Sequence, residues 1–358
     1  MIEKTNKNIC TLPNVSIVVI GLNVEKFLGN CINAVFNSKY PHNKMDVIYV
    51  DSGSKDHSVE IATSFENVRI VELKSDKPSA AKGRNAGLRI AKHELIQFVD
   101  ADSYLHPNWL FNAVGYLNHG IAAVAGNLNE RFPKRNWIHR VSDLEWNLRS
   151  GKSGWTTTGE ESSTFGGNVI IRKEVLNICK GYDENLNAGE DPDLSYRTRQ
   201  LGFKIYRINE PMASHDINIS SFRQFNIRSK RSGFAYAQLA AKYWRNKEKF
   251  MLQRIARIMV GAVTPIMVLS MGFFFGYPTT GLVLSLVIAF RLLFKIGKFA
   301  RLFNIKLSMA CVYSLYLAYV VYPQFFGVIQ GFWQGVTNKF HIGNRIIMSD
   351  SNLIRTHP

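Results

Sequence analysis

Residues 80–103 read AAKGRNAGLRIAKHELIQFVDADS, and this stretch contains the pattern that decides the fold. A helical pattern covers 79–91, and a short apolar run typical of a buried strand follows at 94–99. Asp100 and Asp102 come directly after that run. The stretch therefore predicts a helix, then a buried strand, then two acidic side chains at the point where the strand ends.

The same alternation runs through the sequence before this stretch. Short apolar runs typical of strands lie at 15–21, 46–51 and 68–73, and helical patterns lie at 25–36 and 57–65. Strands and helices that alternate at this spacing indicate a parallel, doubly wound sheet, so the predicted class is α/β. Ligands of such sheets bind beyond the carboxyl ends of the strands, which is where candidate site residues are expected.

Polar residues follow the predicted strands. Asn23 follows the first strand and Asp51 the second, and Asp51 fits either a ligand contact or a cap for the next helix. Asp100 and Asp102 repel each other unless a cation or hydrogen-bond donors compensate, and Mg²⁺ or Mn²⁺ prefers oxygen ligands of this kind. A purely structural turn is the plainer alternative for these two aspartates.

The basic residues are unevenly distributed along the chain. Its 358 residues include 44 Lys and Arg against 27 Asp and Glu, a formal net charge of +17, and 46% are apolar, which excludes a disordered chain. Residues 1–248 hold 26 of the acids and 33 of the bases, whereas 249–358 hold one acid and 11 bases. Because the excess is greatest in an apolar tail, it indicates a membrane before it indicates a nucleic acid.

The tail contains three long apolar stretches. Residues 258–277 carry no charge and are long enough for a transmembrane helix, and a second helix is expected to end near Phe290 in a basic loop over 291–306. The third stretch, 307–330, contains Pro323 and fits either a kinked span or a re-entrant pair of half-helices. Two or three spans are therefore expected, and a buried helical hairpin of a soluble domain is the alternative.

The flanking charges predict the orientation of these spans. Arg254, Arg257 and the basic residues of 291–306 place their side in the cytosol by the positive-inside rule. The first 30 residues contain no secretory signal, and the four cysteines show no metal-binding spacing, which favours a reducing compartment. We expect a multi-pass protein of the cell (inner or plasma) membrane with its N-terminal domain in the cytosol.

Four ordered motifs resemble those of family 2 glycosyltransferases with a GT-A fold. They are PNVSIVVIGLNVEKFL from residue 13, VDSGSKDHS from 50, the stretch at 80–103, and FGGNVIIRKEVLNICKGYDENLNAGEDPDLSYRTRQLGFKIY from 165. The resemblance covers about residues 13–235 and depends on the order and spacing of all four. It implies a GT-A catalytic domain with a Rossmann-like, mostly parallel sheet, followed by an α-helical membrane segment.

The resemblance also implies roles on the donor side of the site. It assigns nucleotide binding to Asn23, Asp51, Arg84 and Asp100, with Asp51 at the base or ribose. The plain alternative for Arg84 is an ordinary arginine on a helix surface. Asp100 and Asp102 match the DxD motif that holds Mg²⁺ or Mn²⁺ against the diphosphate of a nucleotide-sugar donor. His215 is expected to complete this metal site, or else to be an ordinary surface or core histidine.

On the acceptor side, the resemblance points to the GEDPD motif at 189–193. Asp191 is the predicted general base of an inverting transfer, and Glu190 orients the site. Acids at this position could instead only cap the following helix. Gly166 and Gly167, with Thr164 and Asn168, are predicted to let backbone approach the sugar or acceptor.

One motif departs from the pattern of processive polysaccharide synthases. Those enzymes carry QxxRW beside the membrane, whereas this chain has Gln224, Arg228 and Arg231 at another spacing and without the tryptophan. Arg228 and Arg231 are expected to contact the diphosphate or anionic headgroups. Aromatic and basic residues are mixed over 130–150 and 220–250, as in surface-lying helices, and no nucleic-acid-binding motif accompanies them.

These observations combine into one expectation for organisation and function. A GT-A domain is predicted at 1–218, basic juxtamembrane helices at 219–254, transmembrane helices at 255–336 and a tail at 337–358. The expected activity is transfer of a sugar from a nucleotide sugar to a lipid-linked or glycan acceptor, in cell-surface polysaccharide or glycolipid synthesis, with membrane lipids as partners and no nucleic acid. The alternatives are a processive polysaccharide synthase and a non-catalytic membrane scaffold.

Overall fold

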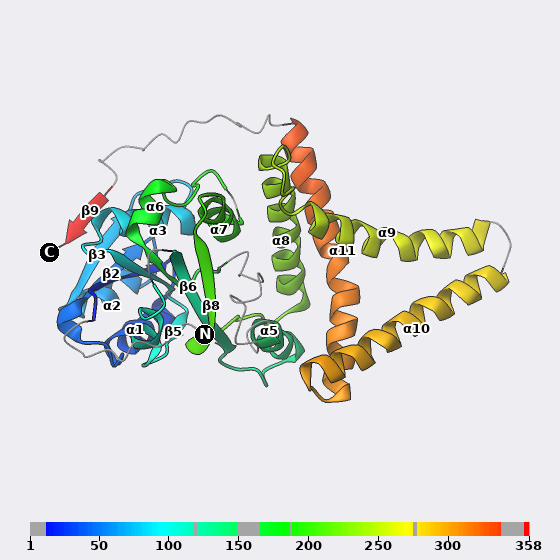
Figure 1. Cartoon of the computed structure of the whole chain (residues 1–358), viewed down its shortest axis with the longest axis horizontal. Helices are drawn as coiled ribbons and strands as arrows, with labels where there is room; N and C mark the ends of the chain where they lie inside the picture. The colour runs from blue at the N-terminus through cyan, green and yellow to red at the C-terminus, as the bar shows by residue number, and fades with distance from the viewer. Residues whose placement is uncertain are drawn as a thin grey trace. The chain divides into compact units, whose positions relative to one another are not determined.

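A computed structural model describes residues 12–117, 120–148, 165–186, 188–274, 278–337 and 354–357 (Figure 1). The chain forms two compact units. The first comprises Met1–Phe132, Ser142–Ile217 and Arg345–Pro358, and the second comprises Pro133–Val141 and Asn218–Asn344.

The first unit is built around a parallel four-stranded core. All four strands predicted in the N-terminal half are present: β1 (Val15–Gly21), β2 (Met45–Asp51), β3 (Val68–Leu73) and β4 (Leu95–Asp100). They pair in the order β4-β1-β2-β3. The last residues of β1, β2 and β4 therefore reach the same edge of the sheet, as the sequence predicted.

Beyond β4 the sheet is mixed. The further strands are β5 (Ser103–Leu105), β6 (Ile121–Glu130), β7 (Val169–Arg172), β8 (Lys204–His215) and β9 (Ile354–His357). β7 runs antiparallel to both β4 and β6, β5 runs antiparallel to β8, and β9 runs antiparallel to β3, whereas β6 and β8 are parallel. The predicted α/β class is confirmed, and the parallel arrangement is limited to the β4-β1-β2-β3 half and to the β6/β8 pair.

Helices connect these strands. They are α1 (Glu25–Phe36), α2 (Ser58–Thr63), α3 (Ala80–Ile90), α4 (Trp109–Ala113), α5 (Trp137–Leu148), α6 (Lys173–Ile178) and α7 (Glu190–Gln200), with a 3₁₀ turn at His42–Lys44. The Ser79 hydroxyl caps α3 by accepting a hydrogen bond from the N–H of Lys82 at 3.3 Å. A Cβ on Gly87 would lie 2.2 Å from Val18, so a glycine lets α3 approach β1 closely.

The second unit is helical. Its long helices are α8 (Phe222–Lys242), α9 (Leu252–Phe274), α10 (Pro278–Phe303) and α11 (Leu307–Thr337). α11 continues through Pro323 as one helix, so the alternative of two re-entrant half-helices is wrong. α8 starts with a capping box, in which the Ser221 and Gln224 side chains each accept a hydrogen bond from the other residue's backbone N–H.

The basic loop predicted over 291–306 is mostly helical instead. α10 extends to Phe303 and carries Arg291, Lys295, Lys298 and Arg301. The spacing of these bases by three or four residues places them along one side of the helix. Because lysine and arginine are good helix formers, charge alone does not end a helix.

One helix among the described residues is long and apolar enough to cross a membrane. It covers Leu307–Gln334 within α11, and this assignment rests on length and composition alone. The prediction of two or three spans stays a prediction.

α8 and α11 lie side by side in Figure 1 and approach each other at backbone level. A Cβ on Gly327 would lie 2.0 Å from the carbonyl oxygen of Lys230, and one on Gly233 would lie 2.0 Å from that of Gln324. A Cβ on Gly331 would lie 2.7 Å from the Cβ atom of Ala237. Small residues at these positions let two backbones meet, as in many helix pairs of membrane proteins.

This packing leads to a testable prediction. Gly327→Ala places a methyl group against a backbone carbonyl and should destabilise the helical unit by about 1–3 kcal/mol. Gly297→Ala on α10 is the matched control, because no atom lies within 4 Å of its added Cβ. Thermal unfolding of both variants checks this, and equal melting temperatures for the two would contradict the close packing.

Candidate active site

Arg84 lies at the centre of the candidate site. It is on α3, and its side chain is only 3% exposed, so the interpretation as an arginine on the helix surface is wrong. Its Nη2 lies 2.8 Å from Asp100 Oδ1 at the end of β4. Its Nη1 lies 3.2 Å from Glu190 Oε1 and 3.3 Å from Asp191 Oδ1, at the start of α7. One guanidinium thus joins three carboxylates from two distant parts of the chain.

The start of α7 directs its acids toward Arg84. Gly189 occupies the N-cap position with φ +89°, a conformation that glycine adopts without strain. Glu190, Asp191 and Asp193 follow in the first turn, where the helix dipole favours negative charge. Asp193 is fully buried and pairs with Arg197 at 2.7 Å, so this acid is structural. Glu190 and Asp191 therefore do more than cap the helix, because both contact Arg84.

An aromatic residue supports the guanidinium. The Tyr182 ring centroid lies 5.2 Å from Arg84 Cζ, within range of a cation–π interaction. Asn85 fixes the Tyr182 backbone, because its Nδ2 donates to the Tyr182 carbonyl at 2.9 Å and its Oδ1 accepts from the Tyr182 N–H at 2.8 Å. Asn85 and Tyr182 lie within the motifs at 80–103 and from 165, but the sequence alone assigned them no role. The only local feature that could have indicated a role was the position of Asn85 next to Arg84.

The environment changes the acidity of Asp191. Burial raises the pKa of Asp191 to about 7. The charge of Arg84 acts in the opposite direction, whereas the carboxylates of Glu190 and Asp100 raise the pKa further. Burial alone would lower the pKa of Arg84, but the charges of Asp191, Asp100 and Glu190 raise it well above its usual value. Arg84 thus stays charged, while Asp191 exchanges its proton near neutral pH.

The β5/β8 pairing brings His215 to the aspartate turn. Ser103, directly after Asp102, pairs with His215 at the end of β8. His215 Nε2 then lies 3.2 Å from Asp102 Oδ2, and the Trp146 ring packs edge-on against the imidazole at 5.4 Å. The structure therefore brings Asp102 and His215 together, as expected for a shared site. The sequence indicated a surface-lying helix around Trp146 and not a contact with His215.

The aspartate turn fits a divalent cation. Asp102 Oδ1 is buried and has no hydrogen-bond partner among the residues that the structure describes, so it offers an uncompensated oxygen ligand. Carboxylate oxygens and an imidazole nitrogen are donors that Mg²⁺ or Mn²⁺ accepts, the imidazole favouring Mn²⁺. This combination supports a cation site more strongly than a purely structural turn.

The backbone of Gly167 packs against the Arg84–Asp100 pair. A Cβ there would lie 2.1 Å from Asp100 Oδ2 and 2.5 Å from Arg84 Nη2, whereas one on Gly166 meets nothing within 4 Å. Asn168 links the two ends of the aspartate turn, because its Oδ1 accepts from the Asp100 N–H at 3.4 Å and its Nδ2 donates to the Ser103 hydroxyl at 3.0 Å. The Gly167 backbone thus lies against side chains of the site, and the predicted approach of Gly166 and Gly167 to the sugar or acceptor stays a prediction. Thr164 lies outside the described residues.

Asp51 and Asn23 order the loops after β2 and β1. The Asp51 carboxylate accepts hydrogen bonds from the N–H groups of Gly53 and Ser54 at 2.8 and 2.7 Å, and from the Tyr49 hydroxyl at 3.0 Å. Asn23 has φ +54°, and its Oδ1 accepts from the N–H of Lys55 at 2.9 Å. Their predicted contacts with a nucleotide stay predictions.

The remaining predicted site residues belong to the second unit. Arg228 and Arg231 lie on α8 and are exposed. Their predicted contact with the donor diphosphate stays a prediction.

Gly167 gives a direct test of the site geometry. Gly167→Ala should displace Asp100 or Arg84 and lower stability by about 1–3 kcal/mol, because the methyl group overlaps both side chains. Gly166→Ala, one residue earlier, should unfold like the wild type. Urea unfolding of the two variants measures the difference, and a neutral Gly167→Ala would refute the tight contact.

The pKa of Asp191 predicts how stability depends on pH. An acid whose pKa is about 7 when folded and near 4 when unfolded weakens the fold as pH rises from about 4 to about 7, because only the unfolded chain readily releases the proton. Asp191→Asn removes this effect. The measurement is the melting temperature of Asp191→Asn minus that of the wild type, with a chelator present. This difference should be larger at pH 8 than at pH 5.

The exposed Asp76 provides the control for this measurement. Asp76→Asn makes the same substitution at an exposed position, and its melting-temperature difference from the wild type is subtracted at each pH value. A corrected difference for Asp191→Asn that stays the same at pH 5 and pH 8 would contradict the raised pKa of Asp191.

The sequence of the chain is similar to those of known glycosyltransferases. A sequence model of the family described as glycosyl transferase family 2 matches residues 16–178. Glycosyltransferase AglE of Haloferax volcanii is 25% identical over 210 residues, which cover 57% of this chain and 67% of AglE. The probable glycosyltransferase YdaM of Bacillus subtilis is 26% identical over 217 residues, which cover 57% of this chain and 51% of YdaM.

A solved structure shares the fold. The mannosyltransferase PcManGT of Pyrobaculum calidifontis, in complex with GDP-Man and Mn²⁺, aligns with a TM-score of 0.61 at 18% identity, over 91% of this chain and 89% of that one. The family match, the relatives and this shared fold agree with the predicted α/β class and with the motif resemblance. Residues 16–178 of the chain are therefore similar to the family 2 glycosyltransferases, and the chain has a GT-A fold.

Proposed function

We propose that this glycosyltransferase moves a sugar from a nucleotide-sugar donor to a lipid-linked or glycan acceptor, with inversion at the anomeric carbon. The observation that carries the proposal is Asp191, a carboxyl group with a pKa of about 7 held beside Arg84. A general base is most effective when its pKa lies near the working pH. Asp191 is therefore the group that accepts the proton of the acceptor hydroxyl.

Asp100, Asp102 and His215 are the residues that would hold a divalent cation, Mg²⁺ or Mn²⁺. Their donor atoms and the uncompensated Asp102 Oδ1 support this assignment. PcManGT was solved with Mn²⁺ and GDP-Man, which supports the same class of cofactor and donor here. The cation supplies positive charge that makes the nucleoside diphosphate a better leaving group.

Arg84 organises the chain's own groups for this reaction. Its charge holds Asp100 on one side and the Glu190–Asp191 pair on the other. Arg84 thereby keeps Asp100, on the donor side, at a fixed distance from Glu190 and Asp191 on the acceptor side. Glu190, which shares Nη1 with Asp191, keeps the base oriented and raises its pKa.

We place the protein in the cell membrane with its catalytic unit in the cytosol. The apolar helix α11 and the basic excess of the C-terminal third support this location. Asn23 and Asp51 are assigned to the nucleotide, Gly166 and Gly167 to the sugar or acceptor pocket, and Arg228 and Arg231 to the diphosphate. The products are polysaccharides or glycolipids of the cell surface.

A transfer assay tests this function. Purified full-length protein, with Mn²⁺ or Mg²⁺, is incubated with membrane lipid extract and a panel of nucleotide sugars, and released nucleoside diphosphate is measured. We expect release with at least one donor, its loss with a chelator, and a decrease of about 10²–10⁴-fold in Asp191→Asn. Donor binding by Asp191→Asn should persist, and Asp76→Asn should have wild-type activity.

The outcomes separate the alternatives. No release from any donor with either cation would contradict the proposal, and binding without turnover would favour a scaffold. Loss of donor binding in Asp191→Asn would move this residue to the donor side. A ladder of long products on a gel would identify a processive synthase.

A further inference from the structure

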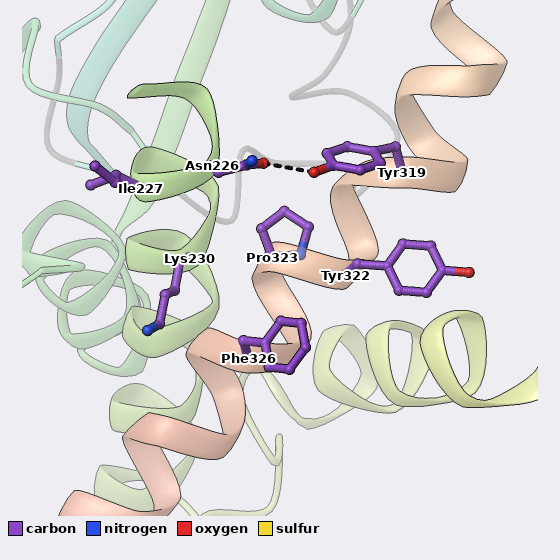
Figure 2. A pocket seen from close by; sticks show the side chains of 7 residues that line it. All are labelled: Asn226, Ile227, Lys230, Tyr319, Tyr322, Pro323 and Phe326. Carbon is purple, nitrogen blue, oxygen red and sulfur yellow. Dashed lines mark hydrogen bonds between the residues drawn. The ribbon is translucent and has the colours of Figure 1, made fainter. Parts of the chain in front are cut away.

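A pocket of about 330 Å³ lies between α8 and α11 of the helical unit (Figure 2). Its walls are formed by Asn226, Ile227 and Lys230 of α8 and by Tyr319, Tyr322, Pro323 and Phe326 of α11. Its size is at the lower end of the range for small-molecule sites. None of these residues belongs to the Arg84 cluster.

The two walls are held in place. The Tyr319 hydroxyl donates a hydrogen bond to Asn226 Oδ1 at 3.0 Å, and Figure 2 shows these two side chains directed toward each other across the pocket. The backbone contact of Gly327 with Lys230 lies about two turns further along α11. A ligand would therefore meet a pocket that already exists, at a low cost in ordering.

The polar groups of the pocket are donors. The Tyr319 contact uses the acceptor atom of the Asn226 amide, which leaves its NH₂ group without a hydrogen-bond partner among the described residues. The Lys230 ammonium, four residues along α8, likewise has no partner in the described part of the chain and is exposed. α8 and α11 contain no Asp or Glu. The pocket thus presents a positive charge and N–H groups with no protein carboxylate nearby on either helix to neutralise them.

The rest of the lining is apolar or aromatic. Ile227 and Phe326 are each 59% exposed, and Tyr322 and Pro323 complete this wall. Three of these four residues lie on α11, the helix with the length and composition of a membrane span. An occupant that satisfies both halves of the pocket carries an anionic head and a hydrocarbon chain.

We propose that the α8/α11 pocket binds a membrane lipid with a phosphate head, which contacts Lys230 and the Asn226 amide while its chain lies along Ile227, Tyr322 and Phe326. Phosphate accepts hydrogen bonds from both donors and balances the lysine charge. The proposal rests on the proposed membrane location, and it is independent of sugar transfer.

Binding to the detergent-solubilised full-length protein tests this proposal. Native mass spectrometry measures the dissociation constants of oleoyl lysophosphatidic acid, of monoolein, which has the same chain and no phosphate, and of glycerol 3-phosphate, which has the head and no chain. We expect the lysophosphatidic acid to bind at least about tenfold more tightly than either fragment, because only it uses both halves of the pocket.

Two variants with the same charge change locate the binding site. Lys230→Gln should weaken the lysophosphatidic acid complex about tenfold or more, since a charge-assisted contact is lost. Lys242→Gln, at the other end of α8, should bind like the wild type. Circular dichroism confirms that both variants are folded.

Several results would overturn the proposal. Equal weakening in both lysine variants would show general charge attraction, and equal affinity for monoolein would show that phosphate is not recognised. Equal affinity for glycerol 3-phosphate would assign the pocket to a soluble phosphate compound. Because binding is measured directly, failure here is distinct from failure of the transfer assay.

Discussion

The catalytic unit depends on one buried positive charge. Removing an arginine from water is costly unless carboxylates and hydrogen bonds compensate, and Arg84 meets this requirement with acids from β4 and from the start of α7. The compensation exceeds the charge, because three carboxylates surround one guanidinium. This excess of negative charge, together with burial, raises the pKa of Asp191 to about 7. The same ion cluster that joins α3, β4 and α7 therefore creates the group suited to proton transfer.

The surroundings of this cluster leave it little freedom. Asn85 fixes Tyr182 under the guanidinium, and Gly167 leaves no room for any side chain beside the Arg84–Asp100 pair. Asn168 ties the aspartate turn to the neighbouring strand. A site held by such contacts keeps its geometry without a bound ligand, and preorganised charge is what a polar transition state requires.

The helical unit is held together by different physics. α8 is basic, yet it packs closely on the apolar helix α11. Backbone contacts at Gly233, Gly327 and Gly331 let the two helices meet, and apolar and aromatic side chains of both helices pack around these contacts. Local patterns predicted the helices here but not their limits. Bases spaced at helical intervals extend α10 to Phe303, and Pro323 lies within α11 without dividing it. In both cases the chain's helical preference overrides a residue that was interpreted as a boundary.

The sequence by itself determined the four parallel strands, the helices between them and the acids at the strand ends, because hydrophobic periodicity and strand direction are local properties. It also identified Asp100, Asp102, Asp191 and His215 as candidates, through motif order. Only the tertiary structure decided that Arg84 is buried, that Tyr182, Asn85 and Trp146 support the site, and that the sheet becomes mixed after β4. These features join residues up to about a hundred positions apart in the chain. No local pattern encodes the burial and the charge balance that arise only when such segments pack together.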